Sequence, residues 1–269
     1  MLETEVGRLR VVPVSDGLAK LPPSYFGNVD WERHQALLGP DGTLDMPIGA
    51  FLVHTGERTV LVDAGVGPLR DDTWLGGELP AALAEAGTGP EDVDLVVCTH
   101  LHMDHVGWLV QDGVPFFPRA TVRFGAADWD HFVTRRGGAE RTWRAMEALD
   151  RAGRLEPVSA DGEALAGGVN ARLTPGHTPG HMAVVLASGS ERAYLLGDAV
   201  HIPNQIEEPD WVNTNDVDPA TAAAAREALW KELEEGGHPF TAAHFPGLEF
   251  GRLLRGEGRR WFAAGLGPR

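Results

Sequence analysis

Short apolar stretches separated by turn residues recur along most of this 269-residue chain, and this pattern predicts β-strands. Helical periodicity follows several of them and is clearest over 218–234, where Asp218 can cap the helix and Pro219 suits its first turn. Strands grouped between helices predict α/β layers. The predicted strands are 9–14, 48–54, 59–63, 93–98, 120–124, 170–174, 182–187 and 193–197, and the predicted helices are 78–86, 126–133, 139–151 and 218–234.

Several predicted strands run directly into polar residues. One strand ends at Asp63, the next is followed by Thr99 and His100, and a later one is followed by Asp198. Apolar strands would deliver these side chains to one rim of a sheet, where ligands are held more rigidly than on loop tips. The pattern therefore predicts a site at that rim.

Composition narrows the class of protein. The chain has 39 Asp and Glu against 23 Lys and Arg, a formal charge of −16, which disfavours nucleic acids and anionic membranes as partners. No apolar run approaches the roughly 20 residues that span a bilayer, and the first residues lack an apolar signal-peptide core. The single cysteine, Cys98, fits a reducing, cytoplasmic setting and excludes thiolate-rich zinc modules. We expect one domain over residues 1–269.

The strongest chemical signal is the segment Thr99-His100-Leu101-His102-Met103-Asp104-His105. In an extended segment His100 and His102 point to the same side, and Asp104 and His105 can reach a second point if the chain then turns into a helix. Three imidazoles and a carboxylate within six residues suit zinc or another borderline divalent ion. One segment cannot complete two metal shells, so further ligands must follow later strands. The candidates are His177 and His181 in TPGHTPGH, Asp198 in LLGD, and His244 in TAAH.

Taken together and in this order, these motifs resemble the metallo-β-lactamase superfamily over about residues 12–244. The resemblance implies a four-layer αβ/βα sandwich with a two-metal site at one edge. It implies that Asp198 bridges the metals, that His181 is structural, and that Asp63 orients a ligand histidine. The implied ligands are His100, His102 and His177 for one metal and Asp104, His105 and His244 for the other. Zinc is the default metal, with manganese, iron or cobalt as alternatives.

The resemblance implies hydrolysis by a hydroxide that bridges the two metals, because no G-x-S-x-G nucleophile motif is present. The similar branch contains N-acyl homoserine lactonases and methyl parathion hydrolase, so we expect cleavage of lactones or related esters. Phosphotriester hydrolysis is the alternative, and a thioesterase, a β-lactamase or an inactive metal-binding homologue are weaker ones. Many of these lactonases carry a tyrosine three residues after the bridging aspartate, where this chain has His201. We expect Asp104, Asp198 and His201 to serve catalysis.

Aromatic side chains crowd the flanks of the motifs and predict a pocket for a small, hydrophobic, neutral ester or lactone. The loop over 203–216 follows the bridging aspartate and could face the substrate. Relatives are often dimers, so a homodimer is possible. The predicted substrate-binding residues are Phe26, Trp108, Phe117, Trp211 and Phe245.

Overall fold

The computed structural model describes residues 3–265 and contains two large β-sheets. The first sheet has the strand order β1-β2-β4-β5-β7-β10-β11, with β6 paired to β2. It is antiparallel from β1 to β5 and parallel from β5 to β11. Its strands are β1 (Thr4–Val6), β2 (Leu9–Leu21), β4 (Leu44–His54), β5 (Thr59–Val62), β6 (Trp74–Leu75), β7 (Leu95–Val97), β10 (Thr121–Gly125) and β11 (Leu155–Val158).

The second sheet has the order β12-β13-β14-β15-β17-β18-β19, and its neighbouring strands are antiparallel except for β15 and β17. Two short ladders lie outside the sheets, where β3 pairs with β16 and β8 pairs with β9. The strands of the second sheet are β12 (Ala164–Ala166), β13 (Val169–Leu173), β14 (Met182–Ser188), β15 (Glu191–Leu195), β17 (Pro239–Thr241), β18 (Gly251–Gly256) and β19 (Arg259–Ala264). The short ladders are formed by β3 (Phe26–Gly27), β16 (Val212–Asn213), β8 (Val110–Gln111) and β9 (Val114–Pro115).

The longest helix, α5, begins as its sequence predicts, because the Asp218 side chain accepts a hydrogen bond from the backbone N–H of Thr221 at 3.0 Å. It ends at Gly237, whose φ of 58° is the left-handed conformation that favours glycine. The helices are α1 (Leu79–Glu85), α2 (Met103–Val106), α3 (Glu140–Arg151), α4 (Asn204–Glu207) and α5 (Pro219–Gly236). Short 3₁₀ turns are η1 (Pro23–Tyr25), η2 (Gln35–Leu37), η3 (Pro90–Asp92), η5 (Gly197–Ala199) and η6 (Pro246–Leu248), and η4 (Trp129–Thr134) is π-helical.

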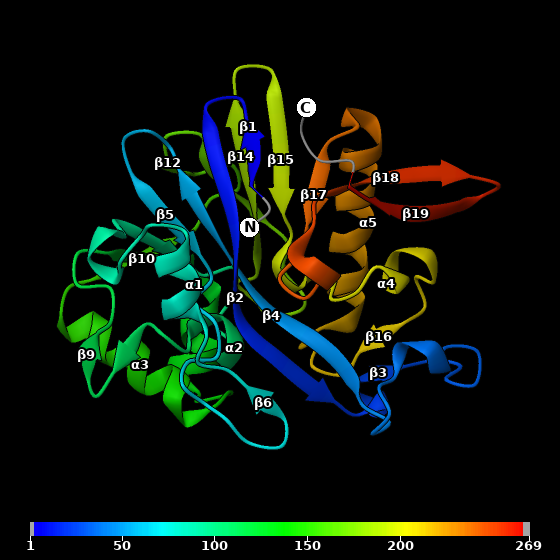
Figure 1. The fold of residues 1–269 in the computed structure, drawn as a ribbon, viewed down its shortest axis with the longest axis horizontal. Helices are drawn as coiled ribbons and strands as arrows, with labels where there is room; N and C mark the ends of the chain where they lie inside the picture. The colour runs from blue at the N-terminus through cyan, green and yellow to red at the C-terminus, as the bar shows by residue number, and fades with distance from the viewer. Residues whose placement is uncertain (1–2, 266–269) are drawn as a thin grey trace.

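Three buried clusters define four layers. One cluster joins side chains of both sheets, such as Phe51 and Val184, and therefore fills the space between them. A second joins the first sheet to Leu83 of α1 and Met146 of α3, and a third joins the second sheet to Trp230 of α5. Figure 1 shows α1 and α3 on one side of the molecule and α5 on the other. The four-layer αβ/βα sandwich is thus confirmed.

Most predicted elements are present, but the structure adds short strands that were not predicted, such as β1, β11, β12 and β17, and differs in three further ways. Strands β2 and β4 extend well beyond the predicted stretches because they form a long two-stranded arm. The helix predicted over 126–133 is the π-helical turn η4, and the hairpin of β18 and β19 was not predicted because arginine and glycine interrupt its apolar residues. Among residues 3–265 no helix has the length and apolarity to cross a membrane.

Candidate metal centre

The predicted ligand segments meet where strands of both sheets end. His100 follows β7, Asp198 follows β15, and His244 follows β17 after two alanines. His177 lies in the connection between β13 and β14. Because β5 and β7 are parallel, and β15 and β17 are parallel, their carboxyl ends deliver these side chains to one edge of the sandwich.

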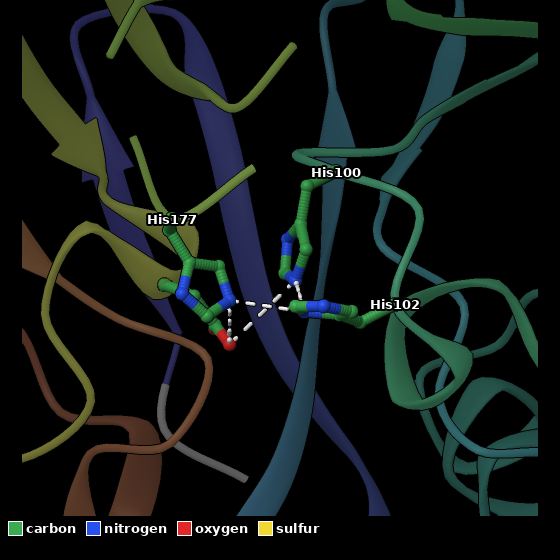
Figure 2. A group of neighbouring side chains, drawn as sticks. His100, His102 and His177 are labelled. Atoms are coloured by element: carbon green, nitrogen blue, oxygen red, sulfur yellow. Dashed lines mark hydrogen bonds and ion pairs between the residues drawn. The ribbon is translucent and has the colours of Figure 1, made fainter. Parts of the chain in front are cut away.

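One group of side chains consists of His100, His102, His177 and Asp198, whose ligand atoms all lie within 4.8 Å of one another. Figure 2 shows the three imidazoles pointing toward a common centre, two from the segment after β7 and one from the β13–β14 connection. The Nε2 atom of His100 lies 2.9 Å from Nδ1 of His102, and that nitrogen lies 3.0 Å from Nε2 of His177. Converging ring nitrogens of this kind are typical of a cation site.

The second group consists of Asp104, His105 and His244, also within 4.8 Å. Asp198 faces both groups with different oxygens. Its Oδ1 atom lies 3.3 Å from Nε2 of His105 and 3.2 Å from Nε2 of His244, while its Oδ2 atom lies 3.3 Å from Nε2 of His177. The carboxylate of Asp198 therefore stands between the groups, as a bridging ligand would.

The residues present fit a bound cation at the second group. Nε2 of His105, Nε2 of His244 and Oδ1 of Asp198 are buried and have no hydrogen-bond partner among the described residues. Leaving three such atoms unpaired is costly unless something else satisfies them. Imidazole nitrogens with carboxylate oxygens form the donor set of zinc and similar divalent ions.

Outer contacts fix the orientation of these histidines. Nδ1 of His105 donates to Asp63 at 2.9 Å, and Nδ1 of His244 donates to the carbonyl of Pro47 at 2.6 Å. Asp63 also accepts hydrogen bonds from the backbone N–H and the hydroxyl of Thr99. Each contact leaves the opposite ring nitrogen free to face the centre.

Asp216 was not singled out by the sequence. It accepts a hydrogen bond from Nδ1 of His177 at 2.8 Å, and its other oxygen lies 3.4 Å from a guanidinium nitrogen of Arg226 in α5. The only local signal was its place at the end of the polar loop over 203–216. Nothing in that loop distinguishes Asp216 from its other acids.

His181 is held as a structural residue, in line with the prediction. Its Nδ1 atom lies 2.8 Å from the hydroxyl of Thr174, and its Nε2 atom accepts a hydrogen bond from the backbone N–H of Asp198 at 3.0 Å. Asp128 ties the two histidine segments together by accepting hydrogen bonds from the backbone of Leu101 and Gly180. Both residues hold the ligand loops in place.

Burial and neighbouring carboxylates act oppositely on the centre's histidines. Burial lowers the pKa values of His100 and His102 well below the ordinary value for histidine. Burial also disfavours charge on His177, but hydrogen bonds to Asp198 and Asp216 outweigh it and raise the pKa of His177 to about 9. Neighbouring carboxylates also raise the pKa of His105 and His244, so protons and a bound cation would compete for these three histidines.

His201 lies at the centre but is fully engaged by the protein on one nitrogen. Its Nε2 atom is 3.1 Å from Oδ2 of Asp198 and 2.8 Å from Nδ2 of Asn213. The ring is buried, and Nδ1 has no hydrogen-bond partner among the described residues. Asp104, by contrast, is partly exposed beside His244, with 3.6 Å between Oδ2 and Nε2.

The predicted substrate-binding aromatics divide into two sets. Phe26 and Trp211 lie in one buried cluster, and the ring centroid of Phe26 is 5.9 Å from that of His201. Trp108, Phe117 and Phe245 lie in two other buried clusters, and their role in substrate binding stays a prediction. The first two pack in the cluster around α1 and α3, and Phe245 packs under α5. Apolar side chains beside a motif are more often buried for packing than aimed at a ligand.

Comparison with known sequences identifies relatives of the chain. The model of the metallo-beta-lactamase superfamily matches residues 45–234. An N-acyl homoserine lactonase of Bacillus cereus is 24% identical over 198 residues, covering 67% of this chain and 74% of that protein. Metallo-beta-lactamase domain-containing protein 1 of Mus musculus is 44% identical over 70 residues, so the chain spans only 25% of that protein's length.

Two solved structures share the fold over nearly the whole chain. Hydrolase AbOPH of the beta lactamase superfamily has a TM-score of 0.88 at 24% identity, covering 99% of this chain and 98% of that one. AidC, a dizinc quorum-quenching lactonase, has a TM-score of 0.87 at 22% identity, covering 100% and 98%. At these identities the likeness establishes the fold.

Proposed function

Because the chain belongs to the metallo-β-lactamase superfamily, we propose that it is a dinuclear metal-dependent hydrolase of lactones or related carboxylic esters. The observation that carries the proposal is the position of Asp198, with one oxygen facing each of two groups of ligand side chains. Seven convergent side chains of this kind exceed what a single ion needs. Asp198 would supply one carboxylate oxygen to each of two ions.

Each ion has its own protein ligands. His100, His102 and His177 would hold one, and Asp104, His105 and His244 the other, with Asp198 shared. Two bound divalent cations supply an ionised water at neutral pH and polarise the carbonyl oxygen of an ester. Zinc is the metal that the donor set favours. Asp63 and Asp216 keep His105 and His177 oriented toward the ions.

The substrate class follows from the surroundings and the relatives. Phe26 and Trp211 lie in a buried apolar cluster, and the ring centroid of Phe26 is 5.9 Å from that of His201, so the surroundings of the centre on this side are apolar. The chain's net charge of −16 disfavours polyanionic substrates. A lactonase relative and the lactonase AidC among structures of the same fold support a lactone over other esters.

His201 is proposed to act in catalysis through the bridging carboxylate that it contacts at 3.1 Å. Replacing it in His201→Phe should lower kcat about tenfold or more while metal content stays near two equivalents. Steady-state kinetics and elemental analysis of the same preparation measure both quantities. An unchanged kcat would remove His201 from the catalytic machinery.

A combined metal and substrate measurement tests the function as a whole. Elemental analysis after mild purification should give about two equivalents of metal per chain, because two ligand groups are present. The loaded protein should hydrolyse an acyl lactone faster than paraoxon, a thioester or a β-lactam. One equivalent or less contradicts the dinuclear centre, and preferred turnover of paraoxon makes the protein a phosphotriesterase. A fully loaded protein that turns over none of these is an inactive homologue.

The cytoplasmic location and the homodimer stay predictions.

A further inference from the structure

Tyr25 lies at the centre and belongs to none of the ligand motifs. It ends the 3₁₀ turn η1, directly before β3, and its carbonyl accepts hydrogen bonds from the backbone N–H and hydroxyl of Thr214, both at 3.1 Å. Strands β3 and β16 pair beside it. This short ladder joins residues 26–27 to residues 212–213 in the loop after Asp198. Two distant parts of the chain therefore fix the backbone of Tyr25.

The side chain of Tyr25 adjoins the centre through the ring of His201. Its ring meets that of His201 edge to face, with centroids 5.9 Å apart. Burial and the charges of Asp198 and Asp104, one from each group, raise the pKa of the phenol. A phenol, whose ordinary pKa is about 10, keeps its proton at neutral pH and is a hydrogen-bond donor. The side chains of Asn213 and Asn215 interact with it and orient it.

The threonine hydroxyls and His201 at the centre are buried. The hydroxyls of Thr99 and Thr174 are buried and bond to Asp63 and His181. His201 is buried, and its Nε2 atom is engaged by Asp198 and Asn213. Tyr25, unlike these side chains, is partly exposed, so a bound molecule can contact it.

We propose that Tyr25 is a catalytic residue of the proposed hydrolase, and that its hydroxyl donates to the leaving oxygen of an alkyl ester or lactone. The water oxygen bonds to the acyl carbon, and the bond from that carbon to the leaving oxygen breaks with its electron pair on the oxygen. The Tyr25 proton moves to this oxygen. Of the two protons of the water, one is released when the water ionises, and the other enters the acid product, whose ionisation restores the phenol.

This assignment deepens the proposed function and rests on it, because it selects among ester substrates. An alkoxide is a stronger base than a phenolate, so it needs the proton in order to leave. A nitrophenolate or a thiolate is a weaker base and leaves without one. Tyr25 thus favours lactones and alkyl esters over activated aryl esters and thioesters.

The test compares leaving groups at a constant acyl chain. Wild type, Tyr25→Phe and Tyr194→Phe are assayed on an acyl lactone and on the p-nitrophenyl ester of the same acid. Tyr194, the other tyrosine of the chain, is a matched control because its hydroxyl bonds to Glu232 at 2.7 Å, on the α5 side of the second sheet. Metal content is measured for every preparation.

Tyr25→Phe should lower kcat for the lactone by about 10²-fold, the usual contribution of a positioned acid. Its loss on the aryl ester should be at least about tenfold smaller, with about two equivalents of metal retained. Tyr194→Phe should affect both substrates equally. Equal losses on both substrates in Tyr25→Phe, no loss on either, or a loss of metal would overturn the assignment. A wild-type protein that turns over neither ester contradicts the proposed function itself.

Discussion

Asp63 and Asp216 perform the same task on opposite halves of the metal centre, but the fold positions them differently. Each accepts a hydrogen bond from the Nδ1 atom of a ligand histidine, at 2.9 Å from His105 and 2.8 Å from His177. Asp63 follows β5 directly and is held by Thr99 of the neighbouring strand end. Asp216 lies in a loop and is held by Arg226 from α5.

The difference shows that a carboxylate can orient a ligand histidine from a loop as well as from a strand end, provided that a rigid partner holds the carboxylate. Asp63 has a φ of 62°, a left-handed conformation that aspartate and asparagine tolerate better than most residues. Asp216 obtains its rigidity from a buried guanidinium. The orientation of His105 by Asp63 is therefore supported within the first sheet, whereas that of His177 by Asp216 depends on docking of α5.

The largest expected effect removes what both halves share. Asp198→Ala should abolish measurable activity and reduce metal to less than one equivalent, because its two oxygens face both ligand groups. His181→Ala is the matched control. It leaves the Asp198 N–H without its acceptor and should cost about 1–3 kcal/mol of stability, yet it should retain metal. Equal metal loss in both variants would contradict the ligand assignment.

The second-largest expected effect is a loss of metal affinity in only one of the two ligand groups. Asp63→Asn and Asp216→Asn keep size and backbone preference but remove the charge that supports the imidazole. Each should weaken metal binding about 10–100-fold at its own half of the centre. Titration of the metal-free variants with zinc should then show two binding steps, one with lowered affinity and one with the affinity of the wild type. Two equally weakened steps would mean that the halves do not act separately.

A pH series probes the half that contains His177. Its pKa in the metal-free protein is about 9, above the ordinary 6.5, so its proton stabilises the folded state fully below about pH 6.5. That contribution is lost as the pH rises through about 9. A metal ion must displace the same proton, so metal affinity should increase up to about tenfold per pH unit between pH 7 and 9. Competition with a chromogenic chelator measures this, and an affinity independent of pH would exclude the protonated His177.

The smallest effect concerns the anchor of Asp216. Arg226→Met retains most of the apolar stem but removes the guanidinium 3.4 Å from the carboxylate. Because Asp216 keeps its hydrogen bond to His177, metal affinity should fall less than tenfold. Urea unfolding should show a loss of about 1–3 kcal/mol. A loss of affinity as large as that of Asp216→Asn would show that Arg226 alone positions the carboxylate.

The sequence by itself determined the layered fold and the set of ligand candidates. Apolar stretches fix where strands form, and His100, His102, Asp104 and His105 lie in one short segment whose spacing is a local property. Asp63 was visible for the same reason, since it ends an apolar strand. Such features need no knowledge of distant contacts.

Only the tertiary structure decided which residues complete the centre. Asp216 and Arg226 lie ten positions apart in loop and helix, and Tyr25 reaches His201 from the opposite end of the chain. It also placed Phe26 and Trp211 in the buried cluster next to His201, and Trp108, Phe117 and Phe245 in two other buried clusters. The local sequence pattern does not predict such pairings. The free energy that stabilises them comes from contacts that form only after the layers have docked.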